Sequence, residues 1–211
     1  MGESMRSTES QPENPWPHDM QLSIDEPYSL TYLLFVRQAW ELGIDGVPEL
    51  DPVPSIGASA RPDSVGLDAA YTRWRAEWGR AWTQYEPIDR TTRGPDDETL
   101  RLLELPDDQL ADAVSRMPSP FWDEGIDRPS YEEWRRSLRD DHSRPIQEHP
   151  ERVCLDALIP AWRSGLLTVL QLPYRGYFAE RINPTTLVVS RTTRHNPTLY
   201  RKALGTIGPR Q

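Results

Sequence analysis

The sequence predicts an α+β fold: a mostly helical body with a Trp-rich amphipathic helix, and a small two- or three-stranded sheet near the C-terminus. Apolar residues recur at helical spacing in several segments before residue 150. Two short aliphatic runs, 166–172 and 186–190, follow in the last third and are typical of strands. Eight tryptophans need buried surroundings although the mean hydropathy is only −0.70. Together these observations favour one mixed domain over a disordered chain.

The first 26 residues are rich in Ser, Glu, Pro and Gln, which predicts a disordered or loosely packed tail. A helix is expected from Tyr28 to Leu42 because leucines and alanine recur on one side of it. Gly43 fits the residue that ends such a helix. The following segment, 43–62, holds four prolines and three glycines and therefore predicts an extended loop.

The strongest helical pattern runs from Asp63 to Tyr85. Its aromatic residues recur at spacings of three and four and fall on one face: Tyr71, Trp74, Trp78, Trp82 and Tyr85. A buried tryptophan hides about 150–250 Å² of surface. We therefore interpret this face as the main contribution to the core. The alternative is an aromatic groove for a ligand or peptide.

Pro- and Gly-punctuated loops separate the remaining helices of the body. A charged loop is expected over 86–97, followed by short helices over 98–105 and 107–117. A Ser-Tyr-Glu-Glu sequence after Pro129 predicts a helix to about Arg139. Residues 140–150 read as a polar connector. The body thus spans residues 27–150.

The last segment, 151–211, predicts an α-β-(α)-β-α order that shares one core with the body. Its first helix covers 152–163, with Pro160 expected to kink it or end it early. The strands 166–172 and 186–190 follow, with a helical turn or two between them at 177–182. Asn196 and Pro197 are typical of the start of a closing helix that runs to Leu204.

Charge divides the chain unevenly. Residues 1–150 carry a formal charge of −15 and residues 151–211 carry +6, for a net −9. An acidic body attracts basic partners and repels nucleic acid and acidic membranes. The leading hypothesis is therefore an acidic cytoplasmic protein-binding module, an adaptor or an inhibitor or immunity-type protein, whose protein partner we expect to be basic. No general nucleic-acid binding, secretory signal or membrane span is expected.

The sequence lacks the common catalytic signatures: a nucleophile elbow, a phosphate-binding glycine loop and a zinc-protease helix. One cysteine, Cys154, permits no intramolecular disulfide, and its apolar neighbours predict an inert buried thiol. Asp140, Asp141 and His142, taken with Glu148 and His149, match no metal-binding spacing and are interpreted as a solvated charged loop. Neither a metal nor a cofactor is expected, and catalysis is left open.

The alternative hypothesis is an enzyme or sensor that binds a small anion: phosphate, nucleotide or carboxylate. If the two strands are parallel, the loops after them meet at one end of the sheet, where ligands bind in open α/β sheets. Antiparallel strands would separate those loops. His195 would be the nearby acid or base, and arginines suit such anions. Those arginines could instead pair with the acidic body. The candidate residues are Arg175, Tyr177, Ser190, Arg191, Thr192, Arg194 and His195.

Overall fold

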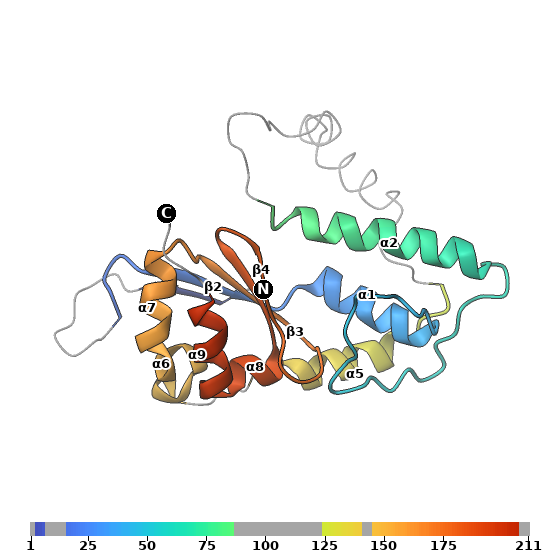
Figure 1. Ribbon diagram of the computed structural model, residues 1–211. Coiled ribbons are helices and arrows are strands. Elements are labelled where there is room, and N and C mark those ends of the chain that lie inside the picture. The colour runs from blue at the N-terminus through green and yellow to red at the C-terminus, as the bar shows by residue number, and fades with distance from the viewer. Residues whose placement is uncertain (1–2, 7–15, 87–123, 141–144, 207–211) are drawn as a thin grey trace, which may run out of the picture.

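The computed structural model describes residues 3–6, 16–86, 124–140 and 145–206 (Figure 1). It confirms the predicted α+β class, with the Trp-rich helix and a sheet that lies mainly in the C-terminal part. The sheet is wider than expected, with five strands in the order β1-β2-β3-β5-β4. The strands are β1 (Glu3–Arg6), β2 (Gln21–Asp25), β3 (Thr168–Leu172), β4 (Ala179–Asn183) and β5 (Thr186–Ser190).

Strand β2 corrects the expectation that residues 1–26 form a tail. It pairs in parallel with β3 and places Leu22 and Ile24 in the core, 1% and 5% exposed. Upstream, Trp16 and Met20 are also buried. These few apolar residues are isolated in a polar segment, so the average composition of the segment does not reveal them. Their alternation within β2 is the signal of a half-buried strand.

Strands β3 and β5 are parallel, and the path of the chain between them makes this direction possible. Segment 177–182 was expected to be helical, but it largely forms β4, which runs antiparallel to β5 at the edge of the sheet. The helical expectation is therefore wrong. After β3 the chain first forms β4, which leaves the place between β3 and β4 open for β5. A tight turn at Pro184 and Thr185 then reverses the chain into β5, which fills that place and runs antiparallel to β4. An edge strand thus replaces the helix of a usual crossover.

Helices cover both faces of the sheet. On one side lie α1 (Tyr28–Ala39), α2 (Leu67–Thr83) and α5 (Arg128–Leu138) (Figure 1). On the other lie α6 (Pro150–Val153), α7 (Leu155–Arg163) and α9 (Pro197–Gly205). The short η1 (Ile146–Glu148) precedes α6, and α8 (Arg191–His195) follows β5 directly.

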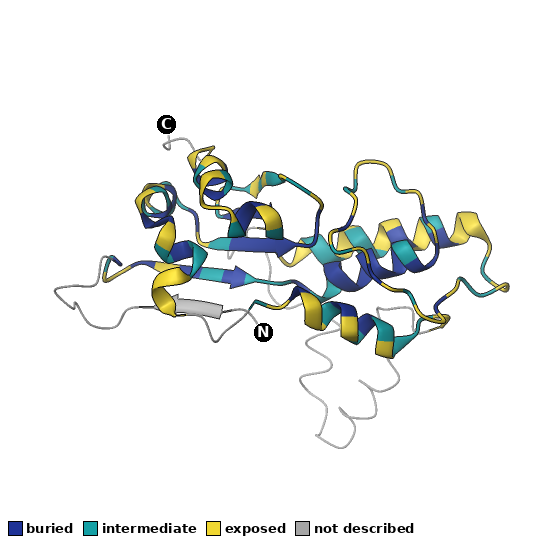
Figure 2. Cartoon of the chain, turned by 90° about the horizontal axis from the view of Figure 1, so that it is seen from below, coloured by how far each residue is buried: buried dark blue, intermediate teal, exposed yellow. Residues whose placement is uncertain are grey.

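Alternate residues of the central strands serve the two hydrophobic clusters. Leu170, Leu172 and Val188 pack with α1, α2 and α5. Val169 and Leu187 pack with the helices of the opposite face. Buried residues accordingly concentrate on the central strands and on the inner sides of the helices (Figure 2). Among the residues described, no helix is both long and apolar enough to cross a lipid bilayer.

Most helices agree with the predictions. The helices expected to start at Tyr28, within 63–85 and after Pro129 are all present. The side chain of Asn196 accepts hydrogen bonds from the amides of Thr198 and Leu199, at 3.0 and 3.1 Å, and caps α9 as expected. The helices predicted over 98–105 and 107–117 lie outside the described residues.

The helix predicted over 152–163 is interrupted at a different place. Pro160 lies inside α7 without ending it, and the break falls at Cys154, between α6 and α7. The Cys154 thiol is buried near the carbonyl of Pro197, and burial raises its pKa. An apolar, buried thiol of this kind is poorly reactive, in line with the structural role expected for it.

The Trp-rich helix divides its tryptophans between two environments. Trp74 is fully buried, and its indole N–H donates a 2.7 Å hydrogen bond to the carbonyl of Leu33 in α1. Trp78 and Trp82 pack against the same cluster but are only half-buried. The core interpretation therefore describes Trp74 well, while the C-terminal half of α2 keeps aromatic surface open.

We predict that Trp74→Phe lowers the free energy of unfolding by about 1–3 kcal/mol, because it removes a buried hydrogen bond and leaves a small cavity. Urea denaturation followed by circular dichroism measures this. Trp82→Phe is the matched control on the same helix and should cost less than about 1 kcal/mol, since Trp82 is half-buried. Equal losses would contradict the assignment of Trp74 as the core anchor.

Candidate functional site

The carboxyl ends of the three parallel strands β2, β3 and β5 meet at one end of the sheet. A cavity of about 420 Å³ lies there, which we call the strand-end cavity. In open α/β sheets this is where ligands bind, because the loops that follow the strands diverge and leave a crevice. The cavity is lined by Ile24, Glu26, Thr31, Arg135, Leu138, Arg139, Asp140, Gln171, Leu172, Pro173 and Arg191.

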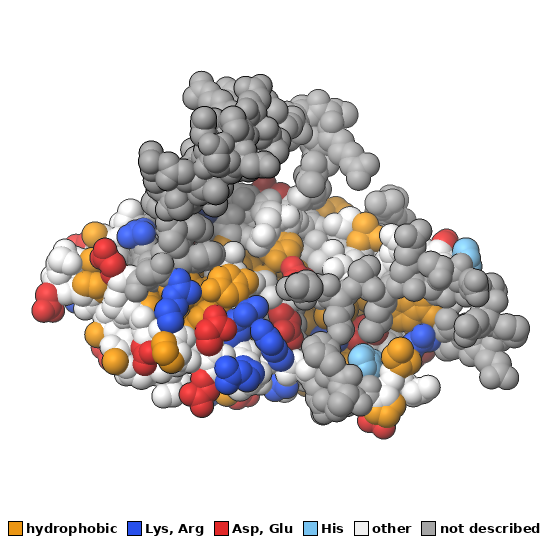
Figure 3. Space-filling model, turned by 180° about the vertical axis from the view of Figure 1, so that it is seen from behind, with side chains coloured by type: hydrophobic (Ala, Val, Ile, Leu, Met, Phe, Trp, Pro, Cys, Tyr) orange, Lys and Arg blue, Asp and Glu red, His pale blue; other side chains and the backbone are white. Residues whose placement is uncertain are grey.

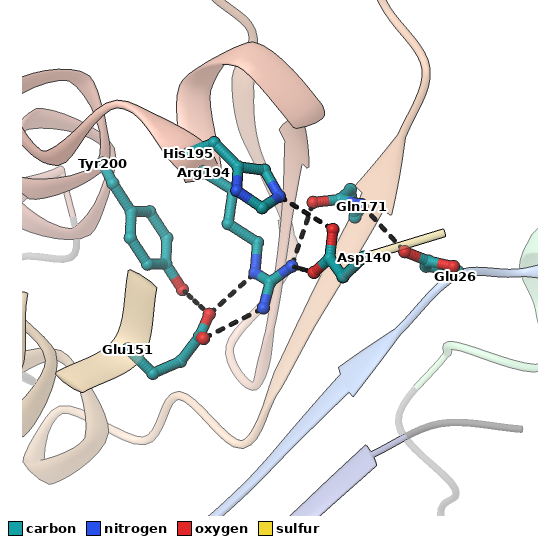
Figure 4. Close-up of polar contacts among 7 residues, drawn as sticks. All are labelled: Glu26, Asp140, Glu151, Gln171, Arg194, His195 and Tyr200. Carbon is teal, nitrogen blue, oxygen red and sulfur yellow. Dashed lines mark hydrogen bonds and ion pairs between the residues drawn. The ribbon is translucent and has the colours of Figure 1, made fainter. Parts of the chain in front are cut away.

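Behind this cavity lies a buried ion pair between Arg194 of α8 and Glu151 of α6 (Figure 4). The two side chains are 1% and 0% exposed. The guanidinium donates from Nε to Oε1 at 2.7 Å and from its second amino group to Oε2 at 2.9 Å. Tyr200 of α9 donates its hydroxyl to the same carboxylate at 3.2 Å. The pair is therefore bidentate and fixes α8 to α6 and α9.

The remaining amino group of Arg194 carries the network to the wall of the strand-end cavity. It donates to Asp140, directly after α5, and to the amide oxygen of Gln171 at 3.1 Å. The Gln171 amide in turn donates to Glu26 at 3.0 Å, and His195 lies 2.8 Å from the second oxygen of Asp140. Figure 4 shows these groups as one connected cluster.

The network shifts the pKa values of its members. Burial by itself disfavours the charge on Asp140, but the hydrogen bond from His195 and the charge of Arg194 outweigh it and hold the pKa of Asp140 well below its ordinary value. Burial likewise opposes the charge of Arg194, and Glu151 more than compensates, so the pKa of Arg194 is raised. Burial and the neighbouring Glu151 raise the pKa of Tyr200, which stays neutral.

Arg191 differs from its neighbours because part of its guanidinium has no partner. Its Nε atom is buried and makes no hydrogen bond in the described structure. Its side chain lines the strand-end cavity and also a second pocket of about 370 Å³, formed with Asp51, Pro52, Thr192 and His195. A buried donor without an acceptor is uncommon and costs free energy unless something satisfies it. The side chain of Arg191 therefore lies between two cavities, and its Nε–H group has no acceptor among the described residues.

Several other basic side chains of the surface have acidic neighbours. On the face shown in Figure 3, Arg and Lys side chains lie next to Asp and Glu side chains, with apolar groups between them. Arg80 pairs with Glu77 at 3.0 Å and Arg201 with Asp156 at 3.1 Å. Exposed pairs of this kind contribute little to stability.

The structure brings some predicted site residues together and separates others. Arg191, Thr192 and His195 all belong to α8 and lie around one pocket with Asp51 and Pro52. The Ser190 hydroxyl accepts from the Thr193 amide at 3.0 Å and caps α8. Arg194 is held by Glu151 and Asp140. This agrees in part with the alternative that the arginines pair with the acidic body, because Asp140 belongs to that body and Glu151 does not.

The loop after β3 contributes less to this region than expected. Arg175 forms an exposed ion pair with Glu49 on the loop before α2. Tyr177 is exposed, and the ammonium of Lys202 lies 4.5 Å from the centre of its ring. The assignment of these two residues to an anion site stays a prediction that their contacts do not favour.

Of the residues that line the strand-end cavity, only Arg191 was among the predicted site residues, and the polar residues missed include Glu26, Arg135, Arg139 and Gln171. Glu26 directly follows β2, so recognising that strand would have placed it at the same end of the sheet. Gln171 is a polar residue in an otherwise aliphatic strand, which is the only local signal it gives. The arginines come from α5 and its end, and no local pattern connects them to the sheet. In the described ranges no group of three or more His, Cys, Asp or Glu residues is arranged to hold a metal.

Comparisons of this chain with models of protein families, with curated proteins and with solved structures gave no match. Its function therefore has to be argued from the geometry of its own residues.

Replacing one member of the buried pair should be costly. We expect Glu151→Gln or Arg194→Met to lower the free energy of unfolding by about 3–5 kcal/mol, because each leaves a buried charge uncompensated. The double variant Glu151→Gln/Arg194→Met should lose less than the sum of the two single changes. Denaturant titrations of all four proteins measure this coupling. Additive losses would show that the two side chains stabilise the fold independently.

Acidification should weaken the contribution of Asp140. Its pKa is depressed in the folded protein, so its stabilisation is present above the unfolded value of about 3.9 and is lost as the pH falls towards the lower folded value. At pH 7 we expect Asp140→Asn to be about 1–3 kcal/mol less stable than the wild type. The gap should narrow at pH 3. A gap that is the same at both pH values in denaturant titrations would contradict this role.

Proposed function

We propose that the protein binds a small anion, a carboxylate or a phosphate ester, in the strand-end cavity. The observation that carries the proposal is Arg191, whose side chain lines this cavity and whose buried Nε has no acceptor among the described residues. An anionic oxygen would accept from that group and convert an unfavourable buried donor into a charge-assisted hydrogen bond. The alternative hypothesis of the sequence analysis thus gains support, with Arg191 rather than Arg175 or Arg194 as its anchor.

The charges around the cavity favour a negative ligand. Arg135, Arg139 and Arg191 all line it, whereas its two carboxylates already have partners within the network. Asp140 is matched by Arg194 and His195, and Glu26 accepts from Gln171. Arg135 stacks on the ring of Tyr28, 4.8 Å from its centre, and also lies 3.7 Å from Glu132, which together orient the guanidinium. The lining of the cavity holds three guanidinium groups and two carboxylates.

The rest of the lining limits the size and shape of the ligand. Ile24, Leu138, Leu172 and Pro173 supply apolar surface beside the arginines. A cavity of about 420 Å³ lies at the small end of the range for sites that enclose small molecules. A short organic anion with an apolar body fits this mixture better than a bare inorganic ion. His195 contacts the site only through Asp140, so the proposal is one of binding.

The test is ligand-induced stabilisation, measured as the shift in melting temperature with inorganic phosphate, glycerol phosphate and succinate against chloride at equal ionic strength. A ligand at 100 times its Kd stabilises the folded state by about 2.7 kcal/mol. We expect an organic anion to raise the melting temperature of the wild type and of Arg175→Met. The shift should be absent in Arg191→Met, which keeps the aliphatic stem of the side chain.

Arg175→Met is the matched control because its guanidinium belongs to the same part of the chain but is bound to Glu49. An equal shift in Arg191→Met and wild type would place the anion elsewhere. A loss of stability in Arg191→Met without ligand, together with no shift in any variant, would make Arg191 a structural residue and overturn the proposal.

A further inference from the structure

Another cavity lies between the C-terminal half of α2 and strands β4 and β5. It has a volume of about 380 Å³, and we call it the aromatic pocket. Its walls carry five aromatic side chains and two carboxylates, and none of the described residues that line it is basic. The aromatic residues are Trp78, Trp82, Tyr85, Tyr174 and Phe178, and the acids are Glu86 and Glu180.

The rings stand at steep angles to one another. The planes of Trp78 and Trp82 are 85° apart with centres at 5.6 Å, and those of Tyr174 and Phe178 are 69° apart with centres at 4.8 Å. In each of these pairs the edge of one ring meets the face of the other, and Trp78 also stacks on Trp74, with planes 17° apart and centres at 4.8 Å. The ring surface that these contacts leave open lines the pocket, and a ring face carries negative electrostatic potential that attracts a cation.

Other aromatic faces of this protein already hold a cation. Arg128 lies over Tyr32, Arg152 over Trp16 and Lys202 over Tyr177, with distances to the ring centres of 4.5–5.3 Å. In the described structure no such contact is made with the rings of the aromatic pocket. Arg37 acts electrostatically on Tyr174, but its two amino groups are bound to the carbonyls of Val47 and Pro48 in one wall. Within the described ranges, these rings therefore offer the acceptor of a cation–π contact, and no described cation occupies it.

The two acids strengthen the preference for positive charge. Glu86 and Glu180 are exposed and form no ion pair in the part of the chain that the structure describes. They differ in this from Glu49, Glu77 and Asp156, each of which has an arginine. A positive group in the pocket would therefore gain two carboxylate neighbours besides the rings.

The position of Glu180 indicates how such a group would arrive. Glu180 lies on β4, the edge strand, which is paired only with β5 in the described sheet. The outer backbone groups of an edge strand can pair with an extended segment of another chain. Ile182, two residues further along the same strand, also lines the pocket and is 36% exposed. An extended segment beside β4 would carry alternate side chains to the pocket.

We infer that the aromatic pocket receives an arginine or lysine side chain from an extended basic segment of a partner protein that pairs with β4. This gives the acidic, protein-binding character expected from the sequence a specific place on the molecule. It is independent of the anion proposed for the strand-end cavity, because the two sites share no lining residue.

The test uses the full chain and a short fluorescently labelled peptide in which arginine alternates with threonine. Fluorescence anisotropy should show saturable binding that weakens as salt rises. A peptide with citrulline in place of arginine has nearly the same shape without the charge, and we expect it not to bind. Free methylguanidine and tetramethylammonium should compete only weakly, because they cannot pair with the strand.

Two variants locate the binding site. Trp82→Leu should weaken peptide binding by about fivefold or more through loss of a cation–π face. Glu86→Gln/Glu180→Gln should weaken it by about threefold, and these exposed changes leave the packing intact even if Trp82→Leu lowers stability. Glu133→Gln is the matched control, because it removes an exposed acid on α5 outside the pocket.

Several outcomes would overturn the inference. One is the absence of saturable binding. Another is an equal effect of Glu133→Gln and Glu86→Gln/Glu180→Gln, which would make the attraction a general property of an acidic protein. Tight binding of tetramethylammonium that excludes the peptide would replace the partner segment by a small-molecule ligand. Each of these outcomes would leave the proposal of an anion in the strand-end cavity untouched, since that proposal is tested with Arg191.

Discussion

The ion pair between Arg194 and Glu151 is the interaction on which the C-terminal part of this structure depends. Removing two charges from water is unfavourable, and only a bidentate geometry with further hydrogen bonds offsets that cost. Here both carboxylate oxygens are bonded to the guanidinium, Tyr200 adds a third donor, and Gln171 and Asp140 accept what remains. The pair links α8 with α6, α9, β3 and the end of α5. Apolar side chains could fill the same space, but they would not fix the relative orientation of these elements through directional hydrogen bonds.

This network also decides which polar groups are left for a ligand. It uses Arg194 for structure, and it holds Asp140 and His195 in a fixed pair whose carboxylate stays ionised at neutral pH. Arg191 begins the same short helix but points to a different environment, where its Nε finds no acceptor. Three residues along one helix therefore separate an arginine that is satisfied by the fold from one that is not.

Sequence reasoning reached the elements whose signals are local. The range of β5, the aromatic face of α2 and the Asn196 cap all follow from spacing and side-chain chemistry within a few residues. Strand β2 was missed because its two buried residues stand in a polar segment, and β4 because its alternation is weak. Because β4 makes the parallel arrangement of β3 and β5 possible, the site could be predicted from the sequence only on the condition that these strands are parallel. The pairing of Arg194 with Glu151 joins residues 43 apart, and nothing local distinguishes Arg194 from Arg191.

The two proposed sites place opposite demands on the charge of the whole chain. A net charge of −9 attracts a basic segment from a distance, so association at the aromatic pocket benefits from the field of the entire protein. The same field repels an anion, which must be held by short-range contacts with arginines such as Arg191, whose Nε is shielded from water. Salt screens the long-range part far more than the buried contacts. Raising the ionic strength therefore weakens the first kind of binding and removes an obstacle to the second, so the two sites respond to salt in opposite directions.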